Sequence, residues 1–270
     1  MRRPHSTLFM INSFTMKHLQ SFSALPAFVA GFILSGFFSL PANAGLVVTG
    51  TRFVLPAPQT ALGITVQNTG PSSLLVKSQV QLDRSQPQMN KAGSRTVDAE
   101  SDASFVLTPP LFVLRAEKSN QLRLTCLECA KLPPDRESLF RLSISAIPSG
   151  KAPENSVQLA IRSHFKLFYR PEGLSGSADT AYQRLQWQRR GKMVTVSNPS
   201  PYYVTLFKMT VNHRPLNNPG MVPPFSTVSQ PWCVDSGSCT IEWQTLDDFG
   251  GEKTPWIVVP TAQKRPGRAG

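Results

Sequence analysis

A hydrophobic period of two over residues 157–169 constrains the fold of this chain more than any other feature of the sequence. The apolar positions are Val157, Leu159, Ile161, Phe165, Leu167 and Tyr169, and mostly polar or basic residues lie between them. Alternation of this kind indicates a β-strand with one apolar face. Pro171, which cannot donate to a sheet ladder, ends the pattern. We therefore predict a strand over 157–169, long enough to serve its own sheet and still leave an edge for a partner's strand.

Other short apolar runs recur along the chain, separated by turn residues such as Asn-Thr-Gly-Pro and Pro-Ser-Gly. The first set of predicted strands is 46–55, 62–67, 74–82, 104–108, 121–125, 139–147 and 157–169. The second set is 185–188, 193–197, 203–211, 221–222, 240–246 and 256–259, with 189–192 as a hairpin turn. Many short strands without amphipathic helices are typical of immunoglobulin-like β-sandwiches. We predict two all-β domains, 45–168 and 169–262, with a hinge near 169–173 and a basic tail at 263–270.

Residues 1–44 have the composition of a secretory signal peptide. They contain no acidic residue and an apolar run over 22–40. Pro41-Ala42-Asn43-Ala44 follows with the small-residue spacing of a cleavage site. A retained membrane anchor is the alternative, but the cleavage site favours removal after Ala44. We therefore expect an exported protein with no stable membrane insertion after cleavage.

The mature chain is basic and long enough for two domains. Removing residues 1–44 from the 270 leaves 226, and the formal net charge falls from +12 to +9 with the loss of Arg2, Arg3 and Lys17. An exported protein rarely meets nucleic acid, and no Lys/Arg run with interleaved aromatic residues indicates a nucleic-acid groove. The charge favours acidic partners, such as carboxylates, or simply supports solubility.

Four cysteines all fall in the predicted mature chain. An even number in an exported chain favours structural disulfides. Cys233 and Cys239 flank a turn-like loop, and a bond between them would close a hairpin end. Cys126 and Cys129 have the spacing of a thiol-disulfide redox motif, but Lys-Leu-Pro-Pro follows, where no helix can begin to lower a thiolate pKa. A four-thiolate zinc site is disfavoured because Cys-x5-Cys is loose for a zinc knuckle.

No recognisable catalytic pattern accompanies these cysteines. His164 and His213 lack an acid or a nucleophile at a recognisable spacing, and we interpret both as surface residues. The sequence shows no Ser/His/Asp, paired-carboxylate or phosphate-loop pattern. We therefore expect a protein that is not an enzyme and that uses no cofactor and no metal.

Eight short segments follow one another over almost the whole predicted mature chain: 51–54, 107–112, 132–140, 146–148, 166–171, 196–205, 220–225 and 247–251. Together and in this order they resemble the signatures of the periplasmic pilus-assembly chaperones of the usher pathway, the PapD-like family. The resemblance implies two immunoglobulin-like domains set at an angle, with a cleft between them. It also implies a periplasmic chaperone that binds pilin subunits by donor-strand complementation and delivers them to an outer-membrane usher for fimbria assembly.

The resemblance assigns roles to three groups of residues. Arg52 and Lys166 match the basic pair that holds the C-terminal carboxylate of a pilin, a task suited to two cations in a partly desolvated site. Val157, Leu159 and Ile161 match the apolar residues that the chaperone lends to an incomplete pilin sandwich. Glu137, Arg170 and Asp248 match a charge cluster across the domain interface. The chain departs from the family at Gln79, where many relatives carry Trp, and at Arg141, where an aromatic residue is usual.

Alternatives to these roles are open at this point. Arg52 and Lys166 could be solvated edge charges, Glu137 could cap a local turn, and the three apolar residues could face their own core, because alternation does not say which face is inside. The alternative functions are an exported thiol-disulfide oxidoreductase built on Cys126 and Cys129, and an adhesive β-sandwich binding protein. An exposed apolar edge also leaves open self-association of the free chain through the donor strand.

Overall fold

The computed structural model describes residues 45–83, 105–150, 154–155, 157–233 and 237–262. The predicted signal peptide at 1–44 and the basic tail at 263–270 lie outside the described residues, as does Ser104 at the start of one predicted strand. Within the described ranges, no helix is both long and apolar enough to span a membrane.

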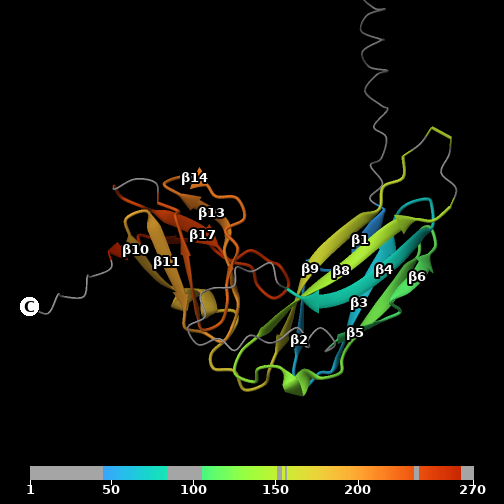
Figure 1. Ribbon diagram of the computed structural model, residues 1–270, viewed down its shortest axis with the longest axis horizontal. Helices are drawn as coiled ribbons and strands as arrows, with labels where there is room; N and C mark the ends of the chain where they lie inside the picture. The colour runs from blue at the N-terminus through green and yellow to red at the C-terminus, as the bar shows by residue number, and fades with distance from the viewer. Residues whose placement is uncertain (1–44, 84–104, 151–153, 156, 234–236, 263–270) are drawn as a thin grey trace, which may run out of the picture. The chain divides into compact units, whose positions relative to one another are not determined.

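The first part of the described chain folds into two sheets (Figure 1). One has the order β1-β3-β7-β5 and the other the order β2-β9-β8-β4-β6. Neighbouring strands are antiparallel except β2 and β9, which are parallel. The strands are β1 (Leu46–Val48), β2 (Arg52–Pro56), β3 (Ala61–Asn68), β4 (Leu74–Leu82), β5 (Phe105–Thr108), β6 (Leu111–Leu114), β7 (Ser119–Cys126), β8 (Ser138–Pro148) and β9 (Ile161–Arg170).

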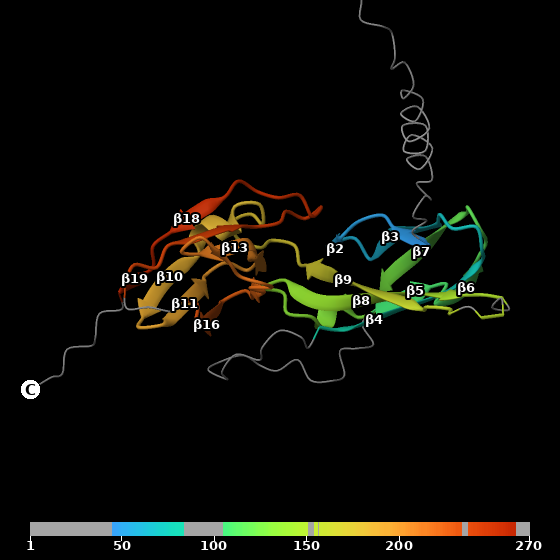
Figure 2. The same ribbon diagram turned by 90° about the horizontal axis from the view of Figure 1, so that it is seen from above.

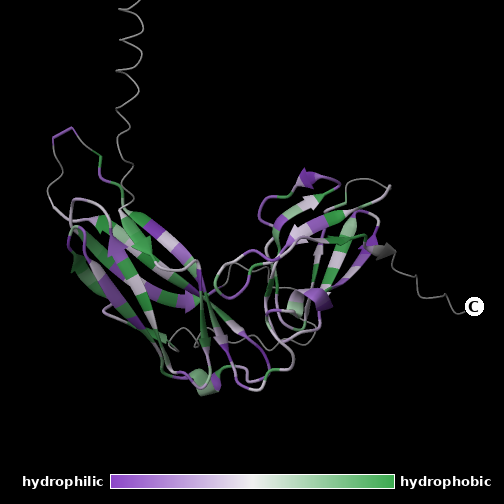
Figure 3. Ribbon diagram, turned by 180° about the vertical axis from the view of Figure 1, so that it is seen from behind, coloured by the Kyte–Doolittle hydropathy of each residue, from purple (hydrophilic) through white to green (hydrophobic). Residues whose placement is uncertain are grey.

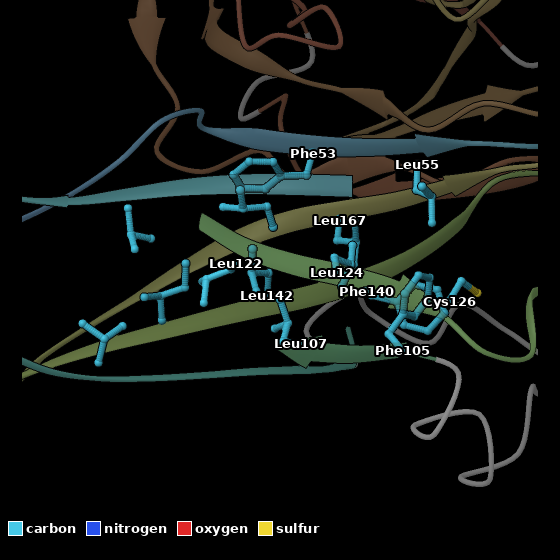
Figure 4. Close-up of a cluster of buried hydrophobic side chains, with 14 of the residues drawn as sticks. Phe53, Leu55, Phe105, Leu107, Leu122, Leu124, Cys126, Phe140, Leu142 and Leu167 are labelled. Atoms are coloured by element: carbon cyan, nitrogen blue, oxygen red, sulfur yellow. The ribbon is translucent and has the colours of Figure 1, made fainter. Parts of the chain in front are cut away.

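Apolar side chains from both sheets form one core between them (Figure 4). Leu55, Leu122 and Leu142 are fully buried there. Phe105 packs edge-on against Phe140 with ring centroids 4.6 Å apart. The hydropathy colouring alternates between hydrophobic and hydrophilic along several strands (Figure 3), as a period of two requires. Period-two patterning therefore produces a two-sheet sandwich, as predicted.

The second part of the described chain forms three further sheets, with the orders β16-β11-β10-β19, β12-β15 and β14-β13-β17-β18 (Figure 2). Their buried side chains form a separate core that includes Trp187, Trp232 and Trp243. The strands are β10 (Gln186–Arg190), β11 (Met193–Asn198), β12 (Val204–Thr205), β13 (Phe207–Val211), β14 (Arg214–Pro215), β15 (Met221–Val222), β16 (Ser226–Gln230), β17 (Ile241–Gln244), β18 (Trp256–Val258) and β19 (Thr261–Ala262). Two short 3-10 helices, η3 (Cys129–Lys131) and η4 (Ala181–Arg184), complete the elements that the structure describes. The predicted all-β fold with two sandwiches is confirmed.

Four predicted strands were too long by more than one residue, and the one predicted at 240–246 covers only Ile241–Gln244. The strand predicted at 46–55 is divided into β1 and β2, which belong to different sheets, and Gly50 between them has a φ of 119°. The strand predicted at 203–211 is divided into β12 and β13, again in different sheets. The strand predicted at 157–169 begins only at Ile161, although the alternation begins at Val157. Continued pairing would place Leu159 opposite Pro148 of β8, and proline has no N–H to donate.

The sequence analysis missed four short strands, β6, β14, β16 and β19. They have two to five residues each, too few for a period to stand out. The hairpin turn predicted at 189–192 is confirmed, because Arg190 pairs with Met193 and Gly191 adopts a φ of 59°.

The four cysteines form two disulfides, Cys126–Cys129 and Cys233–Cys239. The first closes the turn between β7 and η3, and its Cys126 belongs to the core of the first sandwich. The second lies in the core of the second sandwich. Both pairs are therefore bonded, as expected for structural disulfides.

Candidate functional site

Arg52 and Lys166 lie side by side on neighbouring strands. They are register partners in the parallel pair β2–β9, so their side chains leave the same face of the sheet about 5 Å apart. Their chain neighbours Phe53 and Leu167 form the next pair and point into the core. The two side chains therefore leave the outer face of the sheet from directly neighbouring positions.

The Arg52 guanidinium makes three hydrogen bonds to residues of the second sandwich. It donates to the Thr205 hydroxyl at 2.7 Å, to the Asp247 carbonyl at 3.0 Å and to the Leu246 carbonyl at 3.2 Å. It also lies over the Phe168 ring, 5.2 Å from the centroid. Burial lowers the pKa of Arg52 below its ordinary value, although nearby carboxylates oppose this shift. These contacts hold the guanidinium in one orientation.

Lys166 points to a different partner. Its ammonium forms an ion pair with Asp83, whose other carboxylate oxygen pairs with Arg141 at 2.6 Å. Asp83 and Arg141 were not among the predicted site residues. The sequence signal for Arg141 was its departure from the family pattern, in which an aromatic residue is usual at this position; Asp83 gave no signal.

The three residues of the predicted charge cluster are brought together. Arg170 donates from Nε to Glu137 at 2.7 Å and from its two terminal nitrogens to Asp248 at 2.6 and 2.8 Å. The Tyr203 backbone N–H donates to the second Glu137 oxygen at 2.8 Å. Glu137 and Arg170 belong to the first sandwich, whereas Tyr203 and Asp248 belong to the second part of the chain. The cluster therefore ties residues of the two sandwiches to one another.

Burial and ion pairing shift the pKa values of the residues in this cluster. It raises the pKa of Glu137 above its ordinary value, and the attraction of Arg170 only partly opposes the shift. For Arg170, burial alone would lower the pKa, but the hydrogen bonds to Asp248 and the charge of Glu137 outweigh it and raise the pKa. The pKa of Tyr203 is raised by burial and by the Glu137 charge. The surroundings therefore favour the charged form of Arg170 and disfavour the charged form of Glu137.

A small apolar cluster and a cavity lie next to these charges. Leu139, Phe168 and Met221 are buried together, and Val54 and Tyr203 pack against them. A cavity of about 130 Å³ is lined by Arg52, Glu137, Phe168, Arg170, Tyr203 and Asp248, among others. Lys166 does not line it, since its ammonium points to Asp83.

The predicted donor residues are exposed. The exposed fractions are 85% for Val157, 73% for Leu159 and 63% for Ile161. Val157 and Leu159 continue the alternation before β9, whose ladder with β8 begins at the Ala146–Ile161 pair. Their side chains are therefore not part of their own sandwich core, which argues against the alternative that they face this core.

The alternative sites find little support in the geometry. Cys126 is buried and both cysteines of the spaced pair are bonded, and the following 3-10 helix has only three residues. His164 shares a hydrogen bond with the Ser143 hydroxyl at 2.9 Å, on the outer face of the sheet. No group of three or more potential metal ligands occurs in the part of the chain that the structure describes.

Two family profiles match the chain in succession. Residues 45–175 match the pili and flagellar-assembly chaperone family, PapD N-terminal domain. Residues 180–257 match the pili assembly chaperone PapD C-terminal domain.

Individual proteins show the same similarity. An uncharacterized fimbrial chaperone, YcbF of Escherichia coli K12, is 38% identical over 242 residues, which cover 90% of this chain and 96% of that protein. The chaperone protein FimC of the same strain is 37% identical over 215 residues, which cover 77% and 82% of the two chains. In a solved complex of Salmonella enterica SafA pilin with the SafB chaperone, the matched chain is 30% identical with a TM-score of 0.67, over 80% of this chain and 96% of that chain. The periplasmic chaperone SfaE matches with 32% identity and a TM-score of 0.63, over 80% of this chain and the whole of that chain.

Proposed function

Because this chain belongs to the PapD family of pili-assembly chaperones, we propose that it binds fimbrial pilin subunits in the periplasm and delivers them to an outer-membrane usher. It completes the incomplete sandwich of a subunit by lending the segment 157–161, and it acts without a cofactor and without catalysing a reaction. The exchange of this segment for a better-fitting strand of the next subunit provides the driving force for assembly.

The observation that carries this proposal is the exposed alternation of Val157 and Leu159, which precede β9, and Ile161, its first residue. An edge of this kind offers backbone hydrogen bonds to a partner strand and side chains to its open core. Burying each apolar side chain contributes about 1.5–3 kcal/mol before ordering costs. The exposed residues 157–160, which lie outside the β9 ladder, leave the segment able to pair with a foreign strand.

The proposal assigns the remaining predicted residues to two tasks. Arg52 and Lys166 hold the terminal carboxylate of the subunit, since their side chains lie on one face of neighbouring strands. Glu137 and Arg170 of the first sandwich and Asp248 of the second hold the two sandwiches to one another. Pairing of the exposed segment between two copies of the free chain is an additional part of the proposal, because it would cover these apolar residues while no subunit is bound.

Matched substitutions on opposite faces of the donor segment test the main proposal. Leu159→Asp places a charge on the face that would enter the subunit, whereas Gln158→Asp places the same charge on the other face. Periplasmic extracts of cells expressing each tagged variant are purified, and bound proteins are identified by mass spectrometry. We expect pilins to co-purify with the unchanged chain and with Gln158→Asp, and to be absent from the Leu159→Asp sample. Equal capture by both variants would overturn the proposal.

A second substitution separates the chaperone from the adhesive alternative. Lys166→Glu reverses a charge of the proposed anchor on an outer strand face. A chaperone loses subunit capture while the fold is intact, whereas an adhesive domain that binds elsewhere keeps its ligand. Far-ultraviolet circular dichroism of the purified variant provides the control for folding.

A further inference from the structure

Three cations form a row across the larger sheet of the first sandwich. Lys166 on β9 is the register partner of Arg52 on β2 and of Arg141 on β8, and Arg141 is in turn the partner of Gln81 on β4. Register partners project from the same face, so Arg52, Lys166 and Arg141 lie on one face of three successive strands. Like charges that face each other directly are destabilising. A negatively charged group next to the row would therefore reduce the repulsion between the cations.

Asp83 supplies one internal carboxylate for this row. Its backbone N–H donates to the Leu139 carbonyl at 3.4 Å, which continues the β4–β8 pairing past Leu82 and returns Asp83 to the face of Gln81. One carboxylate oxygen binds Arg141 and the other binds Lys166. A single carboxylate thus bridges two cations, so Asp83, Arg141 and Lys166 together carry one net positive charge.

Exposure indicates how these groups are layered. The Asp83 side chain has no exposed surface, whereas 31% of Arg141 and 34% of Lys166 are exposed. The carboxylate therefore lies beneath two cations that reach solvent. An ammonium has three N–H donors and a guanidinium five, and each cation directs one toward Asp83. An anion arriving from solvent can use the others.

Arg52, by contrast, is already held by three oxygens of the second sandwich. Of the three cations, Lys166 and Arg141 are thus the pair that faces solvent with a shared internal partner.

We propose that Arg141 is a third cation of the carboxylate anchor, and that Asp83 is a positioning residue that holds Arg141 and Lys166 side by side. The ligand is the chain-terminal carboxylate of the bound subunit, so this inference rests on the proposed function. Arg141 touches this carboxylate, whereas Asp83 acts only through the two cations.

Peptide binding tests the role of Arg141. The probe is a synthetic peptide of the C-terminal strand of the pilin that the unchanged chain captures, prepared with a free carboxylate and with an amide. One charge-assisted hydrogen bond corresponds to a loss of about tenfold or more in affinity. We expect Arg141→Met to lose this much for the free acid and less than twofold for the amide, with partial rescue by Arg141→Lys. Equal losses for both peptides, or none, would overturn the proposal.

Arg162→Met is the matched control. Arg162 lies on the same face of β9 and donates to the Ser145 hydroxyl at 3.1 Å, two rows away from the anchor. We expect this variant to bind the acid and the amide as the unchanged chain does. If Arg162→Met reproduced the effect of Arg141→Met, a general loss of positive charge would explain the result and the proposal would fail.

Asp83→Asn tests the positioning role because it removes the charge and keeps the size of the side chain. We expect weaker binding of the free acid with amide binding unchanged, since Lys166 and Arg141 then repel each other. A tighter complex with the free acid would make Asp83 a competitor of the subunit and overturn this half of the proposal. Lys166→Met distinguishes a failure of the proposed function from a failure of the role of Arg141. If Lys166→Met leaves binding of the free acid intact, the proposed carboxylate anchor itself fails. If Lys166→Met weakens binding of the free acid and Arg141→Met does not, the role proposed for Arg141 fails while the proposed function stands.

Discussion

At the scale of single residues, Glu137 shows how the charge cluster depends on its surroundings. Only 2% of its side chain is exposed, and its two oxygens accept hydrogen bonds from Arg170 and from the Tyr203 backbone. Burial nevertheless raises its pKa. The ionised carboxylate therefore reduces stability relative to its protonated form, and its partners only partly offset this cost.

The raised pKa predicts a pH dependence of stability with a definite sign. Between the ordinary pKa of 4.5 and the raised folded value, the native state binds more protons at Glu137 than the unfolded state does. The contribution of this group is therefore fully present below pH 4.5 and is lost as the pH rises through the folded pKa. We expect the free energy of unfolding of the unchanged chain, minus that of Glu137→Gln, to decrease as the pH rises through this window. Urea denaturation at a series of pH values measures it, and a constant difference would contradict the assignment.

At the scale of elements, the turn 247–251 is held against the start of β2. The Asp247 carboxylate accepts hydrogen bonds from the backbone N–H groups of Phe249 and Gly251. Gly250 has a φ of 87°, and a Cβ there would collide with the Thr51 hydroxyl. The turn therefore needs glycine both for its backbone conformation and for its close approach to Thr51, the residue before Arg52.

This close approach predicts a graded series of glycine substitutions. Gly173 has a similar φ of 75°, but a Cβ there meets open space. Backbone strain alone costs about 1–3 kcal/mol. We expect Gly173→Ala to lose about that much stability and Gly250→Ala to lose more, with partial recovery in the double variant Gly250→Ala, Thr51→Ala. Thermal and urea unfolding measure the series, and equal losses at the two glycines would show that the contact with Thr51 is unimportant.

The Cys126–Cys129 disulfide closes a turn of only a few residues after β7. For so short a loop, chain entropy predicts a stabilisation of about 2 kcal/mol. We expect the double variant Cys126→Ser, Cys129→Ser to lose about this much stability and still capture subunits in the co-purification assay. Loss of capture by a variant that is still folded would instead favour the oxidoreductase alternative.

At the scale of the whole molecule, polar and apolar contacts connect two separate cores. The hydrogen bonds of Arg52, the cluster around Arg170 and the apolar group of Leu139, Phe168 and Met221 all join the first sandwich to the second. Arg170 is central among them, because its guanidinium binds one nearly buried carboxylate and one that is 37% exposed.

Arg170→Met should therefore weaken the connection between the two cores. It leaves Glu137 buried without its counterion, which costs about 3–5 kcal/mol. Asp248→Asn affects a partly exposed pair and should cost about 1 kcal/mol or less. All four tryptophans, Trp187, Trp232, Trp243 and Trp256, lie in the second part of the chain, so their fluorescence reports on that sandwich alone. We expect fluorescence and circular dichroism to give different unfolding midpoints in Arg170→Met; coincident midpoints would mean that the cluster does not couple the cores.

Much of the fold and of the candidate site could be predicted because the signals are local. Alternation over two residues identified the strands at 74–82 and 193–197 closely, and the positions of Pro and Gly identified the turns between them. The eight motifs identified the family. The roles that they assign to Arg52, Lys166 and the cluster of Glu137, Arg170 and Asp248 remain predictions. Pairing register is not local. For this reason the interruption of the long first strand at Gly50 and the late start of β9 were not predicted.

The sequence by itself determined an all-β chain of the pilus-chaperone family and the alternation of apolar residues that includes Leu159. Only the tertiary structure decided that this alternation lies outside its own core, and that Lys166 shares Asp83 with Arg141. The physical reason is that a period of two defines the two faces of a strand. Which charges meet on a face depends on the register of strands far apart in the chain, because residues 83, 141 and 166 come together only when β4, β8 and β9 pair.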